Sequence, residues 1–140
     1  MTSSALDDRK QNGISVVLDS SALLALAQAE IGAPIVASAV AEGAAMSTVN
    51  LSETYAVLAK AGASLDRAQV LIAALELTIF PFDEDFAMRT AALRVPTMHA
   101  GLSLGDRACL ALARSLGVRA LTGDKQWTNV DVGVELQLIR

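Results

Sequence analysis

The chain has 140 residues, of which 53% are hydrophobic and 19% are charged, and its formal net charge at pH 7 is −4. This length and composition favour one domain with a substantial core, and the negative charge argues against a protein that holds nucleic acid through a broad basic surface. Polar and charged residues interrupt the apolar runs well before the roughly 18 residues that a membrane span requires, and the lone Cys109 excludes an internal disulfide bond.

Residues 1–12 are polar and mixed in charge, without the charged and then apolar pattern of a signal peptide. We expect a flexible tail here, followed by a single domain over residues 13–140, in a cytoplasmic protein that makes no contact with membrane. The β-branched run at 14–18 predicts a buried strand that ends at Asp19. A helix over 22–29 should follow, with Ser20 or Ser21 as its cap, and then a short helix that runs to about residue 41.

A short apolar segment at 45–49 predicts a second strand, after which Asn50 is expected to cap a helix over 51–60. A helix over 65–75 and a strand over 77–82 come next. Asp83 should cap a helix that extends through residue 94, and Ser103 should cap a helix over 104–116 that Gly117 ends. Cys109 falls on the apolar face of that last helix, which indicates a core position. Strands are expected at 119–122 and, at the edge, at 134–139.

Strands that alternate with helices predict an α/β fold, with a mostly parallel central sheet of four to five strands and helices on both faces. In such folds, side chains from distant parts of the sequence meet beyond the carboxyl ends of the strands. Four acidic residues occupy such positions, after a strand or in the opening turns of a helix: Asp19, Glu53, Asp106 and Asp124.

Convergent carboxylates need cations, because two of them about 4 Å apart repel by roughly 4 kcal/mol at the effective dielectric of a protein surface. Mg²⁺ and Mn²⁺ prefer carboxylate and water oxygens, and such ions assist the hydrolysis of phosphodiester bonds. Arg107 and Lys125 lie directly beside candidate acids and are candidate contacts for RNA phosphates.

Each acid also has a purely structural interpretation. Asn50 with Glu53, and Ser103 with Asp106, have the spacing of a capping box, and Asp19 could cap the helix that follows it. Asp124 lies in a TGDK segment, where aspartate commonly forms turns. If all four acids were only caps or turn residues, their shared placement at one edge of the predicted sheet would be accidental.

The segments VVLDSSALLALA, NLSETYAVLAK, SLGDRACLALARSLG and ALTGDKQW resemble, in this order, the motif blocks of PIN-domain ribonucleases, and especially of VapC-type toxins of toxin–antitoxin pairs. The resemblance implies an endoribonuclease dependent on Mg²⁺ or Mn²⁺, with Asp19, Glu53, Asp106 and Asp124 as metal-binding and catalytic residues. It also implies supporting roles for Ser20 or Ser21 and for Thr122, a small antitoxin as partner, and a homodimer. Asn129 and Asp131 are candidates for a further metal-site position.

Two other classes of function stay open at this point. A phosphatase or phosphoacceptor domain also uses aspartate at a strand end with Mg²⁺, but those proteins need a second acid two residues after the nucleophile, or an acidic pair before it. Ser20 and Ser21 follow Asp19 and Leu18 precedes it, so this pattern is missing. The other alternative is a noncatalytic module that keeps the fold and binds a small protein.

Overall fold

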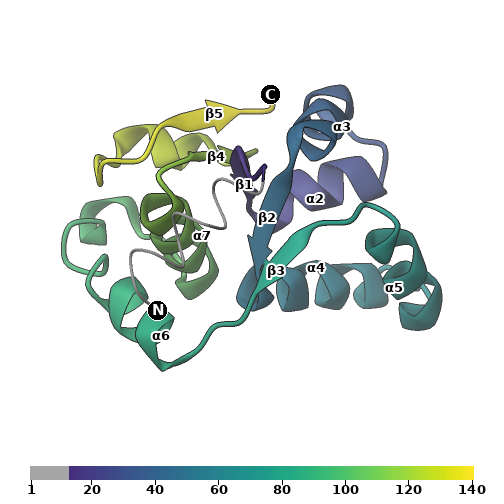
Figure 1. The fold of residues 1–140 in the computed structure, drawn as a ribbon, viewed down its shortest axis with the longest axis horizontal. Coiled ribbons are helices and arrows are strands. Elements are labelled where there is room, and N and C mark those ends of the chain that lie inside the picture. Colours follow the sequence, from purple (N-terminus) through teal and green to yellow (C-terminus); the bar gives the residue numbers. More distant parts are fainter. Residues whose placement is uncertain (1–12) are drawn as a thin grey trace.

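The computed structural model describes residues 13–140, so the expected tail over residues 1–12 lies outside the described residues. Its centre is a five-stranded sheet in the order β3-β2-β1-β4-β5, and every neighbouring pair of strands is parallel (Figure 1). This confirms the α/β class and the mostly parallel sheet, including the edge position of the last strand. The strands are β1 (Val16–Leu18), β2 (Ala44–Ser47), β3 (Thr78–Phe80), β4 (Arg119–Thr122) and β5 (Leu136–Leu138).

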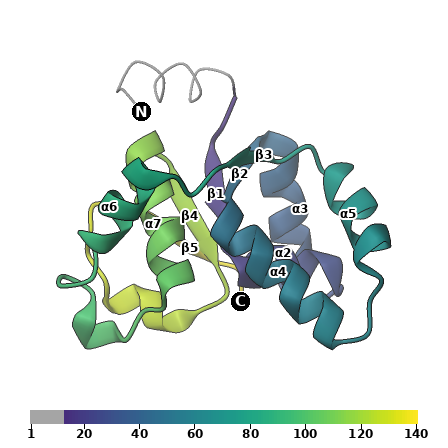
Figure 2. The ribbon, with the colours of Figure 1, turned by 90° about the horizontal axis from the view of Figure 1, so that it is seen from below.

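Helices cover both faces of the sheet (Figure 2). One face packs against α2 (Ser20–Ala27), α3 (Ala33–Glu42), α4 (Thr48–Lys60) and α5 (Leu65–Ala73), and the other against α6 (Glu84–Ala91) and α7 (Leu104–Leu116). Short 3-10 helices span Met98–Ala100 and Lys125–Asn129.

Alternate strand residues supply the two cores. Val17 of β1 belongs to the core under α7, whereas its neighbours Val16 and Leu18 belong to the core under α2 and α3. All three side chains are fully buried, because β1 lies at the centre of the sheet with helices on both sides. Buried parallel strands read as continuous apolar runs for this reason, and the sequence pattern at 14–18 shows this property.

The carboxyl ends of the central strands share one edge of the sheet. Leu18, the last residue of β1, pairs with Leu121 of β4, and Thr122 ends β4 one residue later. β2 pairs with the other side of β1 and ends at Ser47, directly before α4. The register therefore places the residues after β1 and β4, and the first turns of α4, at the same edge.

Several predicted boundaries and caps are wrong. Ser47 caps α4, which begins at Thr48, so Asn50 lies inside the helix and is not its cap. The side chain of Asp19 caps α2 by accepting a hydrogen bond from Ala22 N, so neither Ser20 nor Ser21 is the cap.

The ends of two further helices also differ. α6 begins after its predicted cap, Asp83, but ends at Ala91 rather than at residue 94, and α5 ends at Ala73 rather than at residue 75. By contrast, α7 and β4 have their predicted bounds, and Ser103 and Asp106 form the predicted capping box.

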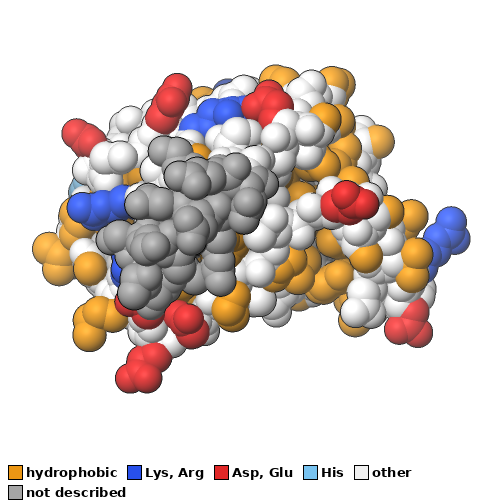
Figure 3. Space-filling view, viewed as in Figure 1, with side chains coloured by type: hydrophobic (Ala, Val, Ile, Leu, Met, Phe, Trp, Pro, Cys, Tyr) orange, Lys and Arg blue, Asp and Glu red, His pale blue; other side chains and the backbone are white. Residues whose placement is uncertain are grey.

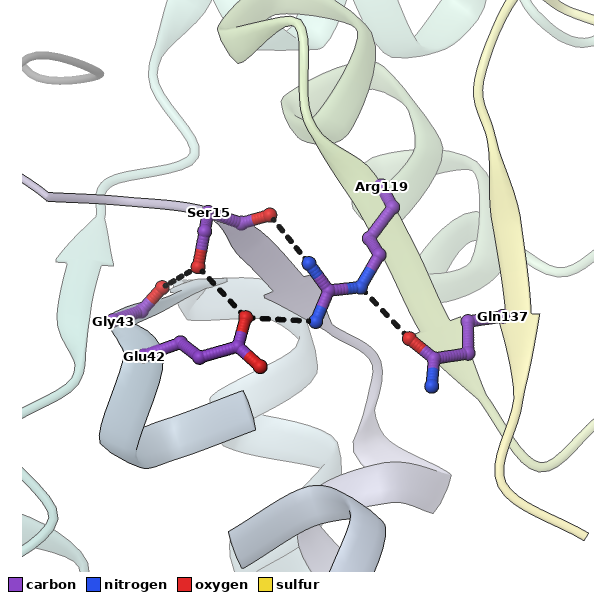
Figure 4. A network of polar contacts seen from close by, with 5 residues as sticks. All are labelled: Ser15, Glu42, Gly43, Arg119 and Gln137. Carbon is purple, nitrogen blue, oxygen red and sulfur yellow. Dashed lines mark hydrogen bonds and ion pairs between the residues drawn. The ribbon is translucent and has the colours of Figure 1, made fainter. Parts of the chain in front are cut away.

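At the amino end of the sheet, Arg119 joins elements that are distant in sequence (Figure 4). Its guanidinium group donates hydrogen bonds to Gln137 Oε1 at 2.7 Å and to the Ser15 carbonyl at 3.2 Å. It also pairs with Glu42 Oε2 at 3.1 Å. A single side chain thus ties β4 to β5, to the start of β1 and to the end of α3, at the sheet edge opposite the acidic residues.

Candidate active site at the carboxyl edge of the sheet

Asp19 lies at the end of β1 and is almost fully buried, with 3% of its surface exposed. Its carboxylate accepts hydrogen bonds from the hydroxyl groups of Ser21, at 2.7 and 2.9 Å, and of Thr122, at 2.5 Å. Ala22 N donates a further bond at 2.8 Å, so the carboxylate is held from both the helix and strand β4. Two of the predicted supporting residues, Ser21 and Thr122, contact Asp19 directly. Ser20 is not among the residues within 13–140 that hydrogen-bond to the Asp19 carboxylate.

The same two hydroxyl groups connect Asp19 to the backbone of the turn that carries Asp124. Ser21 Oγ accepts a hydrogen bond from Gly123 N at 2.8 Å, and Thr122 Oγ1 accepts one from Asp124 N at 3.0 Å. Each hydroxyl therefore donates to Asp19 and accepts from the turn after β4. The Asp124 carboxylate uses Oδ1 to cap the 3-10 helix Lys125–Asn129, through a bond from Gln126 N at 2.9 Å. The turn and capping role expected for Asp124 is thus confirmed, and its backbone N–H is linked to Asp19 through the Thr122 hydroxyl.

Glu53 lies against the turn of α7 that carries Asp106. Asp106 lies in the first turn of α7, where Oδ2 accepts a bond from Ser103 N at 2.9 Å. Glu53, on α4, lies against Gly105 of the same turn so closely that a Cβ atom added to Gly105 would be 2.5 Å from Glu53 Cδ. The capping-box interpretation is confirmed for Asp106. For Glu53 it is wrong, because Asn50 is not a helix cap and its side chain amide donates to Glu53 Oε1 at 3.1 Å.

Three of these acids affect the pKa of the buried Cys109 thiol. Cys109 lies on α7, one turn after Gly105 and Asp106, and is fully buried, as the sequence predicts. Burial raises the pKa of its thiol well above the usual value, and the charges of Asp19, Asp106 and Glu53 raise it further. Three carboxylates, from the end of β1, from α4 and from α7, are therefore near enough to Cys109 for their charges to act on its thiol.

The electrostatics of Asp19 show the cost of this arrangement. Burial raises the pKa of Asp19 from 3.8 to about 6, and the nearby charge of Asp106 acts in the same direction. The hydrogen bonds from Thr122, Ser21 and Ala22 oppose the shift but do not cancel it. A cation at this edge would relieve both the desolvation and the repulsion, because an opposite charge favours the ionised carboxylate.

Within residues 13–140, no three Asp, Glu, His or Cys side chains lie close enough together to hold a metal ion as the side chains stand. The common metal site of the four acids is therefore still a prediction. The available donors fit Mg²⁺ or Mn²⁺, because they are carboxylate and hydroxyl oxygens, and Mg²⁺ typically binds through one or two carboxylates while it keeps several waters. The raised pKa of Asp19 is the structural feature that such an ion would reverse.

The cationic residues near the site differ from those expected. Lys125 is exposed, and Arg107 is half-buried with its Nε atom buried and without a hydrogen-bond partner among the described residues. Arg140 lies outside the sequence motifs, and its guanidinium group lies against Gly123. A Cβ atom on Gly123 would be 2.8 Å from Arg140 Nη2. Arg140 thus brings a cation next to the turn that carries Asp124.

The candidates for a further metal-site position have other contacts. The Asn129 carbonyl lies 2.7 Å from His99 Nε2, which joins the two 3-10 helices. Asp131 is exposed and accepts a bond from Gly133 N at 3.4 Å. Neither of these contacts joins the acidic cluster.

An apolar pocket of about 570 Å³ lies between α2, α4 and α5, apart from the acidic residues. On the face seen in Figure 3, hydrophobic side chains also gather over the part of the molecule formed by α3 and α5. Val70 and Leu71 of α5 are 70% and 61% exposed, which is unusual for large aliphatic side chains in a cluster. The residues that line the pocket include Leu23, Leu26, Leu58, Leu71, Ile72 and Leu75.

Comparison with protein families matches residues 16–133 to the PIN domain. The chain belongs to the PIN-domain family. The matched segment contains every acid of the cluster, from Asp19 to Asp124, so the family resemblance of the four sequence motifs is confirmed. No curated protein sequence matches this PIN domain.

Solved structures share the fold over nearly the whole chain. A toxin–antitoxin complex from Klebsiella pneumoniae has a TM-score of 0.70 at 20% identity, covering 90% of this chain and 98% of that chain. DNA-bound VapBC from Salmonella typhimurium has a TM-score of 0.70 at 15% identity, with 91% and 99% covered. VapC20 of Mycobacterium tuberculosis, described as a toxin that cleaves the sarcin–ricin loop, has a TM-score of 0.68 at 21% identity, with 86% and 99% covered. At these identities the likeness concerns the fold.

Proposed function

We propose that this PIN domain is an endoribonuclease that depends on Mg²⁺ or Mn²⁺, and that it acts as the toxin of a toxin–antitoxin pair. The observation that carries the proposal is the placement of the acids: Glu53 lies against the turn of α7 that carries Asp106, and the Thr122 hydroxyl bonds both the Asp19 carboxylate and Asp124 N. Carboxylates repel one another, so their placement at the same end of the sheet favours a cation-binding role over a contribution to stability.

In this proposal, Asp19, Asp106 and Asp124 hold the ion, and Glu53 positions it or a second ion. The bound ion supplies a nucleophilic water at neutral pH and charge stabilisation for the phosphodiester in the transition state. Ser21 and Thr122 keep the Asp19 carboxylate in one orientation, because each donates a hydrogen bond to it. Arg140, Arg107 and Lys125 are the candidates for contacts to RNA phosphates at the edge of the site.

The decisive experiment uses Asp106→Asn. An asparagine oxygen still accepts the hydrogen bond from Ser103 N, so the helix cap of α7 is retained while the charge is lost. Asp83→Asn is the matched control, since Asp83 caps α6 through Phe86 N and is not among the charges that perturb Asp19 or Cys109.

Purified wild type, both variants and an EDTA-treated sample are incubated with total RNA, and the new RNA ends are mapped. Because one toxin of this fold is described as cleaving the sarcin–ricin loop, structured RNA loops are the first substrates to inspect. We expect cleavage by wild type and Asp83→Asn in Mg²⁺, and a loss of at least about 10²-fold in Asp106→Asn and in EDTA. Full activity in Asp106→Asn would refute the assignment, and metal binding without cleavage would favour the noncatalytic module.

The partner in this proposal is a small cognate antitoxin, and the apolar pocket between α2, α4 and α5 is the surface that we assign to it. Lining side chains such as Leu71 are exposed in the chain alone, and an apolar antitoxin segment would remove them from water. Leu71→Glu should weaken binding of the antitoxin while RNA cleavage stays unchanged, and unchanged antitoxin binding would contradict this location.

We further propose a homodimer as the basic unit and the cytoplasm as its location. Ile35 on α3 and Val70 on α5 are large apolar side chains that a partner subunit would cover. None of the helices within residues 13–140 has the length and apolar composition needed to cross a membrane. Sedimentation equilibrium tests the dimer, and cell fractionation tests the location; a monomer at all concentrations would refute the former.

A further inference from the structure

Asn50 joins the two helices that carry Glu53 and Asp106. Its side chain is 1% exposed, and its amide group donates one hydrogen bond to Glu53 Oε1 at 3.1 Å and another to the Gly105 carbonyl at 3.0 Å. Gly105 is 55 residues away in sequence. One amide group therefore fixes the acid on α4 relative to the opening turn of α7.

These two contacts determine which way the amide of Asn50 points. Both partners are acceptors, so the nitrogen must face them, since an oxygen there would oppose two other oxygens. The amide oxygen, Oδ1, then points into the protein, where it is buried without a hydrogen-bond partner among residues 13–140. Burial of an unpartnered polar atom costs about 1–3 kcal/mol, so stability alone does not explain an asparagine at this position.

Helix capping does not explain Asn50 either. Ser47 caps α4 through Val49 N at 3.2 Å, and Asn50 lies beyond it, inside the helix. Gly105 is unfavourable in its own way, because glycine inside a helix costs roughly 0.5–1 kcal/mol relative to alanine. Its missing side chain is what allows the Glu53 carboxylate to lie against the backbone of α7. Asn50 and Gly105 are thus both unfavourable for local stability, and both contribute to the placement of the Glu53 carboxylate.

We propose that Asn50 is a positioning residue that, together with Gly105, holds the Glu53 carboxylate where the acidic cluster binds a divalent cation. The inference rests on the proposed function and adds a residue that the sequence motifs do not assign. Asn50 acts through Glu53, and its own amide is not a ligand in this scheme. Loss of the amide frees the Glu53 side chain to adopt other rotamers, which weakens cation binding.

The test compares Asn50→Ala with Thr54→Val. Thr54 is a matched control because it is fully buried one turn further along α4, and its hydroxyl donates only to the backbone carbonyl of Asn50. Asn50→Ala removes two hydrogen bonds of a buried side chain and Thr54→Val removes one from the same helix, so urea unfolding measures separately the stability that each variant loses. Only Asn50→Ala removes the contact with Glu53.

Mn²⁺ binding to the RNA-free protein is measured from the electron paramagnetic resonance signal of free Mn²⁺, alongside urea unfolding and the Mn²⁺ dependence of RNA cleavage. We expect at least about a tenfold weaker Mn²⁺ affinity for Asn50→Ala, the size typical of lost support for a metal ligand, and less than about twofold for Thr54→Val. Raised Mn²⁺ should restore part of the lost cleavage rate of Asn50→Ala.

Equal Mn²⁺ affinities for wild type and a folded Asn50→Ala would overturn the proposal. If Asn50→Ala does not fold, Gly105→Ala replaces it, because that variant displaces the same carboxylate without removal of a polar group; wild-type Mn²⁺ affinity there would equally overturn it. If the wild type cleaves RNA while Asn50→Ala and Thr54→Val have the same Mn²⁺ affinity, the role of Asn50 is refuted and the proposed function is retained. Wild-type protein that binds no Mn²⁺ would refute both.

Discussion

Gly105→Ala is the substitution that separates the stability of the fold from the placement of the acidic cluster. The new Cβ would lie 2.5 Å from Glu53 Cδ and nearer still to both carboxylate oxygens. Carbon atoms in ordinary contact are about 3.5–4.0 Å apart, so the carboxylate must retreat by about 1 Å. A displacement of this size at a reacting centre can cost about 10²-fold in rate, which corresponds to roughly 2.7 kcal/mol.

The effect of Gly105→Ala on stability should be small, because opposing contributions nearly cancel. Alanine in place of a helical glycine gains up to about 0.5–1 kcal/mol. Loss of the hydrogen bond from Asn50 to Glu53 costs about 0.5–1.5 kcal/mol. Glu53 is half-buried and flexible, so its side chain can move toward solvent without displacement of the backbone. We therefore expect the free energy of unfolding to change by less than about 1 kcal/mol.

The assay pairs urea unfolding with the cleavage rate and the Mn²⁺ affinity. Leu104→Ala is a suitable control, because Leu104 is the preceding residue of α7 and is 50% exposed. If the Gly105→Ala protein is folded and retains both the wild-type cleavage rate and the wild-type Mn²⁺ affinity, the role of Glu53 placement in the site is refuted. A loss of more than about 2 kcal/mol of stability would show instead that the clash is not relieved by movement of Glu53.

Three further predictions concern stability and RNA binding. Burial raises the pKa of Asp19 to about 6, so folding retains a proton there and the metal-free protein loses stability as pH rises from about 4 to about 6. Relative to Asp19→Asn, wild type should lose up to about 3 kcal/mol between these pH values in urea unfolding, and parallel pH dependences would contradict this. Arg119→Met should lower the free energy of unfolding by about 1–3 kcal/mol, because three partners lose their donor, with little change in the cleavage rate; unchanged stability would argue against the network in Figure 4. Arg140→Gln in the Asp106→Asn background should weaken RNA binding. The slope of the log binding constant against log salt concentration should become shallower by about 0.7, as expected for one lost phosphate contact, and an unchanged slope would exclude that contact.

The pair of hydroxyl groups beside Asp19 links several of the motif residues to one another. Ser21 and Thr122 come from α2 and β4, and their oxygens lie 3.4 Å apart over the same carboxylate. Each also receives a backbone N–H from the turn after β4. A change at either hydroxyl would therefore alter both the orientation of Asp19 and the position of Asp124.

Local chemistry was sufficient where the signals for an element were all close in sequence. α7 has its predicted bounds because Ser103 and Asp106 form a capping box at its start and Gly117 adopts a left-handed conformation, with φ of 68°, at its end. β4 follows directly and has its predicted bounds as well. The placement of the acids after strands or in opening helical turns could likewise be predicted, because parallel strands present their carboxyl ends at one edge.

The start of α4 shows where local chemistry fails. Asparagine is a favourable cap, so the sequence pattern selected Asn50, but Ser47 takes that role at the end of β2. The side chain of Asn50 is instead buried against Gly105, a residue on another helix. Tertiary contacts of this kind override a local preference that is worth about 1 kcal/mol.

Apolar periodicity and strand-end positions depend on neighbours in the chain, so they were sufficient to predict the fold class, the family motifs and four acids placed after strands or in opening helical turns. Folding was needed to bring Asn50 and Gly105 into contact with Glu53, to lay Arg140 against Gly123, and to raise the pKa of Asp19 by burial. These features arise from burial and from contacts between residues far apart in sequence, and both quantities exist only once the sheet has brought its strand ends together.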